Sequence, residues 1–384
     1  LAGAALTLFS APMMAQDVQS QIDAITKVIV NSKSNPDAAK DQVKDFIKEN
    51  KKNAVAIAGV GRAYLDIKDT LNAKKYAEMA IDRDKNNAAG YLLMGDIEVV
   101  NNDGGAAATW YQQATLMDPK NPQGYIKYAN IYRKRSPELS VQMLEKLRTV
   151  QPDYPVDAEA GHFFYTANRF DKAIEYFSKV DLGKFNENYL TEYATATYLS
   201  SDSKKSLDIS QYGVQKNPRD AAMNRLCFYN YTDLKDYPNA LKYADALFNK
   251  SDSAKFSARD YQYYGYALMG DSAFDQAIAQ FEKALELNSS LNDVKKQLSD
   301  AYIAKKDYVK GLALYDEYLK AVEKPSVGDI DGLAKLYADQ AASIATLNEE
   351  KIAALKKADE VYGMLGEKYP TNLLYATILT ARIN

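Results

Sequence analysis

The stretch that decides the fold of this chain is Tyr261–Ala284, which reads YQYYGYALMGDSAFDQAIAQFEKA. Apolar and small residues recur three and four positions apart on both sides of Asp271-Ser272, which is the spacing of one face of an α-helix. Asp and Ser are common turn residues. The stretch therefore predicts two helices of about 12–14 residues, each near 20 Å long, joined by a short turn.

The same pattern recurs along the chain with a period of about 34 residues, which is typical of a repeat protein. One hairpin cannot bury its apolar face alone, so we expect every hairpin to be stabilised by stacking on its neighbours. Small residues at the seam let two helix backbones approach closely. Aligning the copies on the second helix gives a column of small residues, mostly Ala: Ala39, Ala73, Ala107, Val141, Ala173, Ser206, Ala240, Ala277, Gly311 and Ala358.

The spacing of this column widens at two places. It reaches 37 residues before Ala277, which predicts a longer loop at 249–257. It reaches 47 residues before Ala358, so the irregular repeat at about 326–371 has either long helices or an additional helix. Residues 372–384 are predicted to be a first helix without its second, and we expect the natural chain to continue beyond them.

The best copies resemble the tetratricopeptide repeat, whose signature is Trp-x2-Leu-Gly-x2-Tyr followed by Ala-x3-Phe, Ala and Pro. The resemblance covers residues 18–384 and implies an all-α fold, a right-handed superhelical solenoid of helix-turn-helix repeats. We expect about ten repeats over 16–384, the last one incomplete. The residues that carry the resemblance are Tyr261, Tyr264-Gly265, Ala277-x3-Phe281-x2-Ala284, and Tyr91-x2-Met94-Gly95, Ala107-x3-Tyr111-x2-Ala114 and Pro119.

Composition excludes several classes of function. The 48 Lys and Arg are balanced by 51 Asp and Glu, for a net charge of −3, and the sequence lacks the clustered basic residues that bind nucleic acid. A single Cys and a single His exclude a disulfide framework, a thiolate zinc site and a site of clustered histidines. We therefore expect no metal and no cofactor.

No catalytic arrangement is visible either. Gly59-Val-Gly61 lies inside a predicted helix and Gly104-Gly105 in a predicted turn, so neither is a phosphate-binding loop. Cys227 lies on the packed side of a predicted first helix, where a small buried residue is expected rather than a nucleophile. Paired carboxylates fit solvated helix faces better than a cleft. An enzyme is not expected.

Residues 1–15 are apolar, uncharged and end in small residues, which is typical of a partial signal peptide cut before Gln16. The alternative is an apolar helix that belongs to the folded domain. No later stretch is long and apolar enough to span a bilayer, so we expect a periplasmic protein without stable membrane insertion. Secretion and outer-membrane association are the alternatives.

Three predicted turns resemble the Asp-Ser/Thr-aliphatic acceptor of O-glycans on exported proteins of Bacteroidetes-type bacteria. We favour the simpler interpretation that Asp, Ser and Thr are turn and helix-capping residues. The three are Asp69-Thr70-Leu71, Asp252-Ser253-Ala254 and Asp271-Ser272-Ala273.

The resemblance also indicates a binding face. In this family the first helices line a concave groove, and the residue after the small residue of the first helix points into it. Tyr and Arg contribute much of the binding energy at many interfaces, although the same side chains can instead face solvent or pack on neighbouring helices. The candidate partner-binding residues are Asn130, His162, Arg225, Tyr229, Gln262, Tyr266, Lys296 and Asp300.

Some relatives clamp a C-terminal carboxylate with Lys, Asn and Arg on successive first helices. Lys127, Asn130 and Arg133 occur within one repeat here, but the neighbouring repeats offer Asp96 and His162, so the clamp is not reproduced. We expect a non-enzymatic scaffold that binds a protein or peptide. The alternative is a glycan-binding protein of an outer-membrane uptake system, because some such proteins are built on the same repeats and stack sugars on aromatic rings. The sequence does not predict the oligomeric state.

Overall fold

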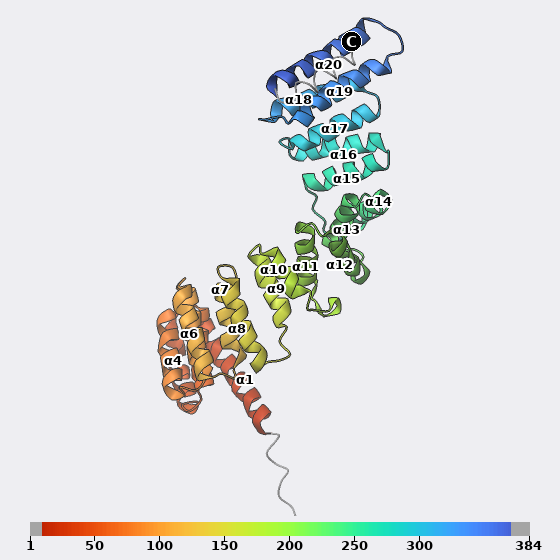
Figure 1. The fold of residues 1–384 in the computed structure, drawn as a ribbon. Coiled ribbons are helices and arrows are strands. Elements are labelled where there is room, and N and C mark those ends of the chain that lie inside the picture. Colours follow the sequence, from red (N-terminus) through yellow and green to blue (C-terminus); the bar gives the residue numbers. More distant parts are fainter. Residues whose placement is uncertain (1–9, 370–384) are drawn as a thin grey trace, which may run out of the picture. The chain divides into compact units, whose positions relative to one another are not determined.

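The computed structural model describes residues 10–369, which contain helices and turns and no strand (Figure 1). The chain forms two compact units, residues 1–196 and 197–384, and each is described by itself. Within each unit, consecutive helices pack as hairpins, and most second helices also pack on the next first helix. The all-α solenoid of helical hairpins expected from the sequence is confirmed.

The first unit pairs α3 with α4, α5 with α6, α7 with α8 and α9 with α10, while α1 packs mainly on α3. Helix α11 ends this part of the chain, and its last residues belong to the second unit. The elements are α1 (Ser10–Asn31), the 3-10 turn η1 (Pro36–Ala39), α2 (Lys40–Glu49), α3 (Ala54–Asp66), α4 (Thr70–Arg83), α5 (Ala88–Val100), α6 (Gly104–Met117), α7 (Pro122–Tyr132), α8 (Pro137–Val150), α9 (Val156–Thr166), α10 (Phe170–Phe177), the 3-10 turn η2 (Leu182–Lys184) and α11 (Glu187–Leu199).

The second unit pairs α13 with α14, α15 with α16, α17 with α18 and α19 with α20, and α12 packs on α13. Its elements are α12 (Ser203–Lys216), α13 (Ala221–Asp233), α14 (Tyr237–Asp245), the π-helical turn η3 (Ala246–Lys250), α15 (Ala258–Gly270), α16 (Phe274–Leu287), α17 (Asn292–Ala304), α18 (Tyr308–Ala321), α19 (Val327–Ser343) and α20 (Glu349–Lys368).

The two irregular places in the repeat have distinct structures. The predicted longer loop is formed by η3 and the non-helical residues 251–257. The long repeat has no additional helix, because α19 and α20 are themselves 17 and 20 residues long. The predicted unpaired helix at 372–384 lies outside the described residues, as does most of the predicted signal peptide, whose end lies in α1.

The turn inside most hairpins uses one backbone device. A non-glycine residue adopts a left-handed φ of 57–66°, and the next residue is usually an Asp that caps the second helix. Asp69 and Asp236, for example, each accept the backbone N–H three residues ahead, at 3.0 Å from Asn72 and 3.3 Å from Asn239. The capping carboxylate satisfies an N–H that has no partner within the helix, so a short polar pair is enough to start each second helix. The left-handed residues are Lys68, Asn102, Asn168, Ser201, Lys235, Ser272 and Lys306.

The small-residue column lies in the core as predicted, since every member of it is buried. In three repeats the aromatic residue four positions later packs on the glycine of its own hairpin. Built at Gly95, Gly161 or Gly265, a Cβ atom would overlap the ring of Tyr111, Phe177 or Phe281 respectively. The ring thus occupies the space that the missing side chain leaves.

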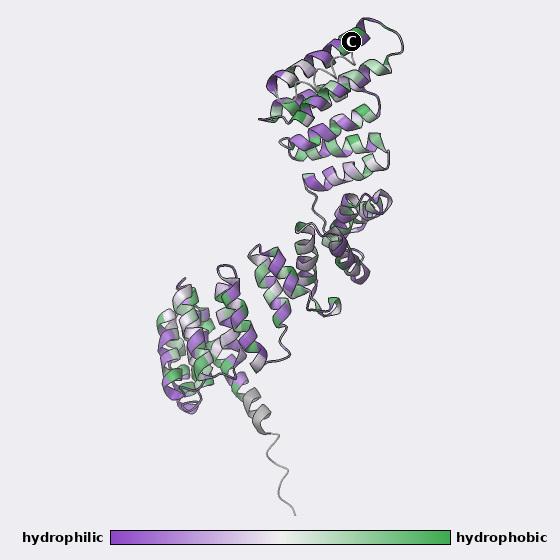
Figure 2. Ribbon diagram, in the orientation of Figure 1, coloured by the Kyte–Doolittle hydropathy of each residue, from purple (hydrophilic) through white to green (hydrophobic). Residues whose placement is uncertain are grey.

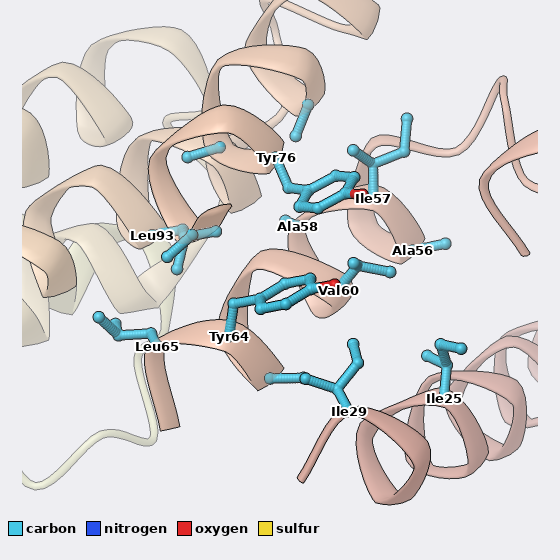
Figure 3. Close-up of a cluster of buried hydrophobic side chains, with 14 of the residues drawn as sticks. Ile25, Ile29, Ala56, Ile57, Ala58, Val60, Tyr64, Leu65, Tyr76 and Leu93 are labelled. Carbon is cyan, nitrogen blue, oxygen red and sulfur yellow. The ribbon is translucent and has the colours of Figure 1, made fainter. Parts of the chain in front are cut away.

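Buried apolar side chains form several clusters, each built from the two helices of a hairpin or from a hairpin and its neighbours. Figure 3 shows one of them, in which Ile25 and Ile29 of α1 lie beside Val60 and Tyr64 of α3. The rings of Tyr64 and Tyr76 stack with centroids 5.6 Å apart. Hydrophilic and hydrophobic residues alternate around the helices of both units (Figure 2), as expected for helices that bury one stripe and expose the other.

Candidate functional site

Charged side chains on neighbouring first helices pair with one another. Helix α3 contacts α5, and α5 contacts α7. Asp96 of α5 forms ion pairs with Arg62 of α3 and with Lys127 of α7, whose Nζ lies at 2.8 Å. The Tyr111 hydroxyl donates to the same carboxylate at 2.6 Å. Burial and this carboxylate raise the pKa of Tyr111, so the phenol remains a hydrogen-bond donor.

The buried carboxylate of Asp260, on α15, has the same role in the second unit. Arg225 Nε donates to Asp260 Oδ1 at 2.6 Å, and the Tyr229 hydroxyl donates to this oxygen at 2.9 Å. The other oxygen accepts the backbone N–H and hydroxyl of Ser257, which completes a capping box at the start of α15. Tyr229 is only 5% exposed, and burial together with the Asp260 charge raises its pKa. Arg225 and Tyr229 therefore join α13 to α15.

Lys296 of α17 pairs in the same way with Asp329 of α19, at 2.8 Å between Nζ and Oδ1. The Tyr318 hydroxyl donates to this oxygen at 3.0 Å, and Ser326 donates to the other oxygen through its N–H and its hydroxyl. Burial alone would raise the pKa of Asp329, but these donors and the Lys296 charge hold that pKa well below its usual value.

Gln262 and Tyr266 of α15 are less buried. Tyr266 is 37% exposed, and its hydroxyl accepts the side-chain amide of Gln297 from α17. The amide oxygen of Gln297 accepts Gln262 Nε2 at 3.4 Å. Asp300, also on α17, is exposed. These two glutamines and Tyr266 therefore present polar atoms at a partly open surface.

His162 and Asn130 lie in the first unit. His162 Nδ1 is 2.8 Å from Glu192 Oε2, and its ring stacks on Tyr189 with centroids 4.8 Å apart. The Tyr189 hydroxyl donates to Glu159 at 2.9 Å, and burial and nearby carboxylates raise its pKa. Asn130 is exposed on α7. The other six predicted residues belong to the second unit, so the structure does not assemble the eight into one described site.

A guanidinium and three tyrosine rings form a group that sequence reasoning missed, which we call the Arg259 cluster: Arg259, Tyr198, Tyr229 and Tyr263. Arg259 Cζ lies 5.7, 5.5 and 5.4 Å from the ring centroids of Tyr198, Tyr229 and Tyr263, within range of cation–π attraction. Its Nη2 donates to the Tyr198 hydroxyl at 3.0 Å. Tyr229 and Tyr263 stack with centroids 4.1 Å apart, so each ring covers one face of the other.

Arg259 and Tyr263 form part of the walls of two open hollows in the second unit. One of them also contains Tyr198 and Asp233. The larger has a volume of about 680 Å³. Its lining includes Arg259, Gln262, Tyr263, Tyr266, Leu287 and Leu291. This hollow unites two of the predicted residues, Gln262 and Tyr266, with a cation and with apolar side chains.

Two of the missed residues, Asp260 and Asp329, share one sequence signal. Each ion pair joins a basic residue to an acid about one repeat later: Arg62 to Asp96, Arg225 to Asp260 and Lys296 to Asp329. Comparing opposite charges between consecutive copies of the repeat would have identified Asp260 and Asp329. No such signal marks Arg259, because its contacts are to tyrosines on three different helices.

The single cysteine of the chain lies in the packed interior of the second unit. Cys227 is fully buried, as predicted, and its thiol donates to Ser210 at 3.3 Å. Burial raises the pKa of Cys227 to about 12, so the reactive thiolate is scarce near neutral pH. Within residues 10–369 no group of three or more His, Cys, Asp or Glu side chains is placed to hold a metal ion. No helix in the same range is both long and apolar enough to cross a lipid bilayer.

Comparison with known proteins identifies the repeat. Residues 265–325 match the family model of the tetratricopeptide repeat. The C-terminal part of a TPR repeat-containing protein from Cytophaga hutchinsonii aligns with a TM-score of 0.50 and 17% identity, over 66% of this chain and 98% of that one. This likeness shows a shared fold. A tetratricopeptide repeat protein from Parabacteroides merdae aligns with a TM-score of 0.39 and 17% identity, over 65% of this chain and 98% of its own. No curated protein matches the chain.

Proposed function

This chain carries tetratricopeptide repeats, and on that premise we propose that it is a non-enzymatic scaffold of the bacterial cell envelope that binds a protein or peptide along its first helices. The observation that carries the proposal is the hollow of the second unit, where Gln262, Tyr266 and Arg259 stand beside Leu287 and Leu291. Polar and cationic groups beside exposed apolar side chains are the composition of a protein-binding surface.

The ion pairs and hydrogen bonds between neighbouring first helices are a second observation that supports this proposal. Arg225, Tyr229 and Lys296 are engaged by carboxylates of the next hairpin, so they fix the relative position of neighbouring hairpins. A partner that contacts a surface held in this way loses little free energy to ordering the scaffold. In the proposal Gln262 and Tyr266 contact the partner directly, and Arg225, Tyr229 and Lys296 support the surface.

The export part of the proposal rests on the apolar and uncharged segment 1–15. Cell fractionation with amino-terminal sequencing of the native protein tests it. We expect the protein in the periplasmic or membrane-associated fraction with Gln16 as its first residue. Recovery from the cytoplasm with residues 1–15 retained would contradict this part.

The binding part is tested by affinity capture from an envelope extract, run beside a glycan array. We expect the wild-type protein to retain a defined protein and no glycan. A Gln262→Ala/Tyr266→Ala variant with unchanged circular dichroism should retain much less of it, and Gln276→Ala, on the exposed side of α16, serves as the control. Equal retention by all three proteins would contradict the proposed face, and a glycan as the only ligand would contradict the proposed class of partner.

A further inference from the structure

The Arg259 guanidinium differs from Arg62, Arg225 and Lys296 in the groups that it contacts. Arg62, Arg225 and Lys296 each pair with a carboxylate of the next hairpin. Arg259 is exposed, and its described contacts are the hydroxyls and ring faces of tyrosines, which are neutral groups. These contacts orient the guanidinium without neutralising its charge.

One acid, Asp233, is exposed and lines the smaller hollow together with Arg259, Tyr198 and Tyr263. Partial desolvation raises the pKa of Asp233, and the hydroxyls of Tyr263 and Tyr198 and the Arg259 charge offset part of that rise. The two hydroxyls lie 2.8 Å apart. Asp233 therefore lines only the smaller of the two hollows, and the lining of the larger one contains Arg259 without this acid.

That hollow combines three kinds of group. Arg259 supplies donors suited to a carboxylate, Gln262 and Tyr266 supply polar atoms, and Leu287 and Leu291 supply apolar surface. Leu287 is 50% exposed, which leaves apolar area for a ligand to cover. A ligand that fits all three has a carboxylate and an apolar group a short distance apart.

We propose that this hollow recognises an acidic side chain, Asp or Glu, next to an aliphatic residue in an extended segment of a partner protein, with the carboxylate on Arg259 and the aliphatic side chain against Leu287 and Leu291. The proposal rests on the proposed scaffold function and names the chemistry of its partner. An acidic sugar would also offer a carboxylate. It fits less well, because Tyr229 and Tyr263 each cover one face of the other ring and Tyr229 is buried.

The test is an array of acetylated and amidated heptapeptides whose central residue is Glu, Asp, Gln or Asn and whose neighbours are Leu or Ser. We expect the full-length protein to bind peptides with a central acid and Leu neighbours about tenfold more strongly than their amide counterparts. This preference should weaken as salt is added, since the pair is partly exposed to water. Arg259→Gln should abolish the preference and Arg259→Lys should retain part of it.

Arg133→Gln is the control, because Arg133 is also an exposed arginine of a first hairpin helix, at the C-terminal end of α7 in the first unit, and it should leave binding unchanged. Equal binding of Glu and Gln peptides, an acidic preference that survives Arg259→Gln, or an array on which no peptide binds would overturn the proposal. The array also carries the same peptides with a free terminal carboxylate and uronic-acid oligosaccharides, and binding restricted to either of these would overturn the proposal as well. If the peptide array contradicts this proposal but the protein still captures a specific native protein, the proposed scaffold function remains supported. If the protein captures no native protein, the scaffold function itself is contradicted.

Discussion

At the scale of single residues, the fold depends on pairs of a glycine and an aromatic ring. The Phe281 ring is fully buried and occupies the space beside Gly265. Interiors are packed closely enough that one additional carbon is felt, and a buried ring enclosed on all sides cannot move aside at little cost. The same relation between Gly161 and Phe177, and between Gly95 and Tyr111, makes this contact a property of the repeat.

We predict that Gly265→Ala lowers the free energy of unfolding by a net amount of about 1–2 kcal/mol, because overpacking outweighs the gain in helix propensity. Gly363→Ala is the control. Gly363 is an exposed residue within α20 with open space where a Cβ would be added, so this variant should gain about 0.5–1 kcal/mol. Urea unfolding followed by circular dichroism measures both. An increase in the free energy of unfolding of Gly265→Ala would show that the Phe281 ring moves aside at little cost, which would contradict the prediction.

At this scale the sequence predicted burial better than pairing. The column from Ala39 to Ala358 is buried throughout, because a small residue at a fixed period has few other uses. The role of Tyr229 could not be predicted, since its partner Asp260 lies one repeat further along the chain and a hydroxyl offers no charge pattern to detect. Arg259 was missed for a similar reason, as its position depends on tyrosines from three helices.

At the scale of elements, carboxylates join neighbouring hairpins in addition to the apolar seams. Asp96, Asp260 and Asp329 each bind a cation from the preceding first helix and at least one tyrosine hydroxyl. Removing one partner of such a group leaves buried donors unsatisfied, which costs more than the contact contributes. These acids therefore set the register of one hairpin on the next.

We predict that Asp329 contributes stability that disappears in acid. Its donors lower its pKa in the folded protein below the ordinary value of 3.8, so the unfolded chain binds the proton at a higher pH than the folded one. The contribution is complete above that value and is lost as the pH falls below it. Asp329→Asn should reduce the free energy of unfolding by about 1–3 kcal/mol near neutral pH, and the difference from wild type should shrink below pH 4.

Urea unfolding between pH 2.5 and 7 measures this difference. Asp339→Asn, which changes an exposed acid on the same helix, is the control. Its free energy of unfolding should differ little from that of the wild type, and this difference should not shrink below pH 4. A wild-type advantage over Asp329→Asn that stays constant or grows toward pH 2.5 would rule out the assigned role of the Lys296, Ser326 and Tyr318 contacts.

At the scale of the whole molecule, periodicity predicted most of the architecture. From Ala54 onward successive first helices begin 31 to 37 residues apart, close to the predicted period of about 34, because caps and turns recur with the seam. The division at residue 196 was not predicted. The small-residue column keeps its spacing across this position, from Ala173 to Ser206. The repeat pattern therefore gives no signal of where one unit ends and the next begins.

We infer, above all, that a partner binds along the first helices of the second unit. A photoreactive benzoylphenylalanine placed at Gln262 on α15, or at Gln276 on α16 as the matched control, tests it in intact cells. We predict a discrete crosslinked protein from position 262 and none from position 276. Crosslinking of equal strength at both positions, or only at 276, would contradict the account.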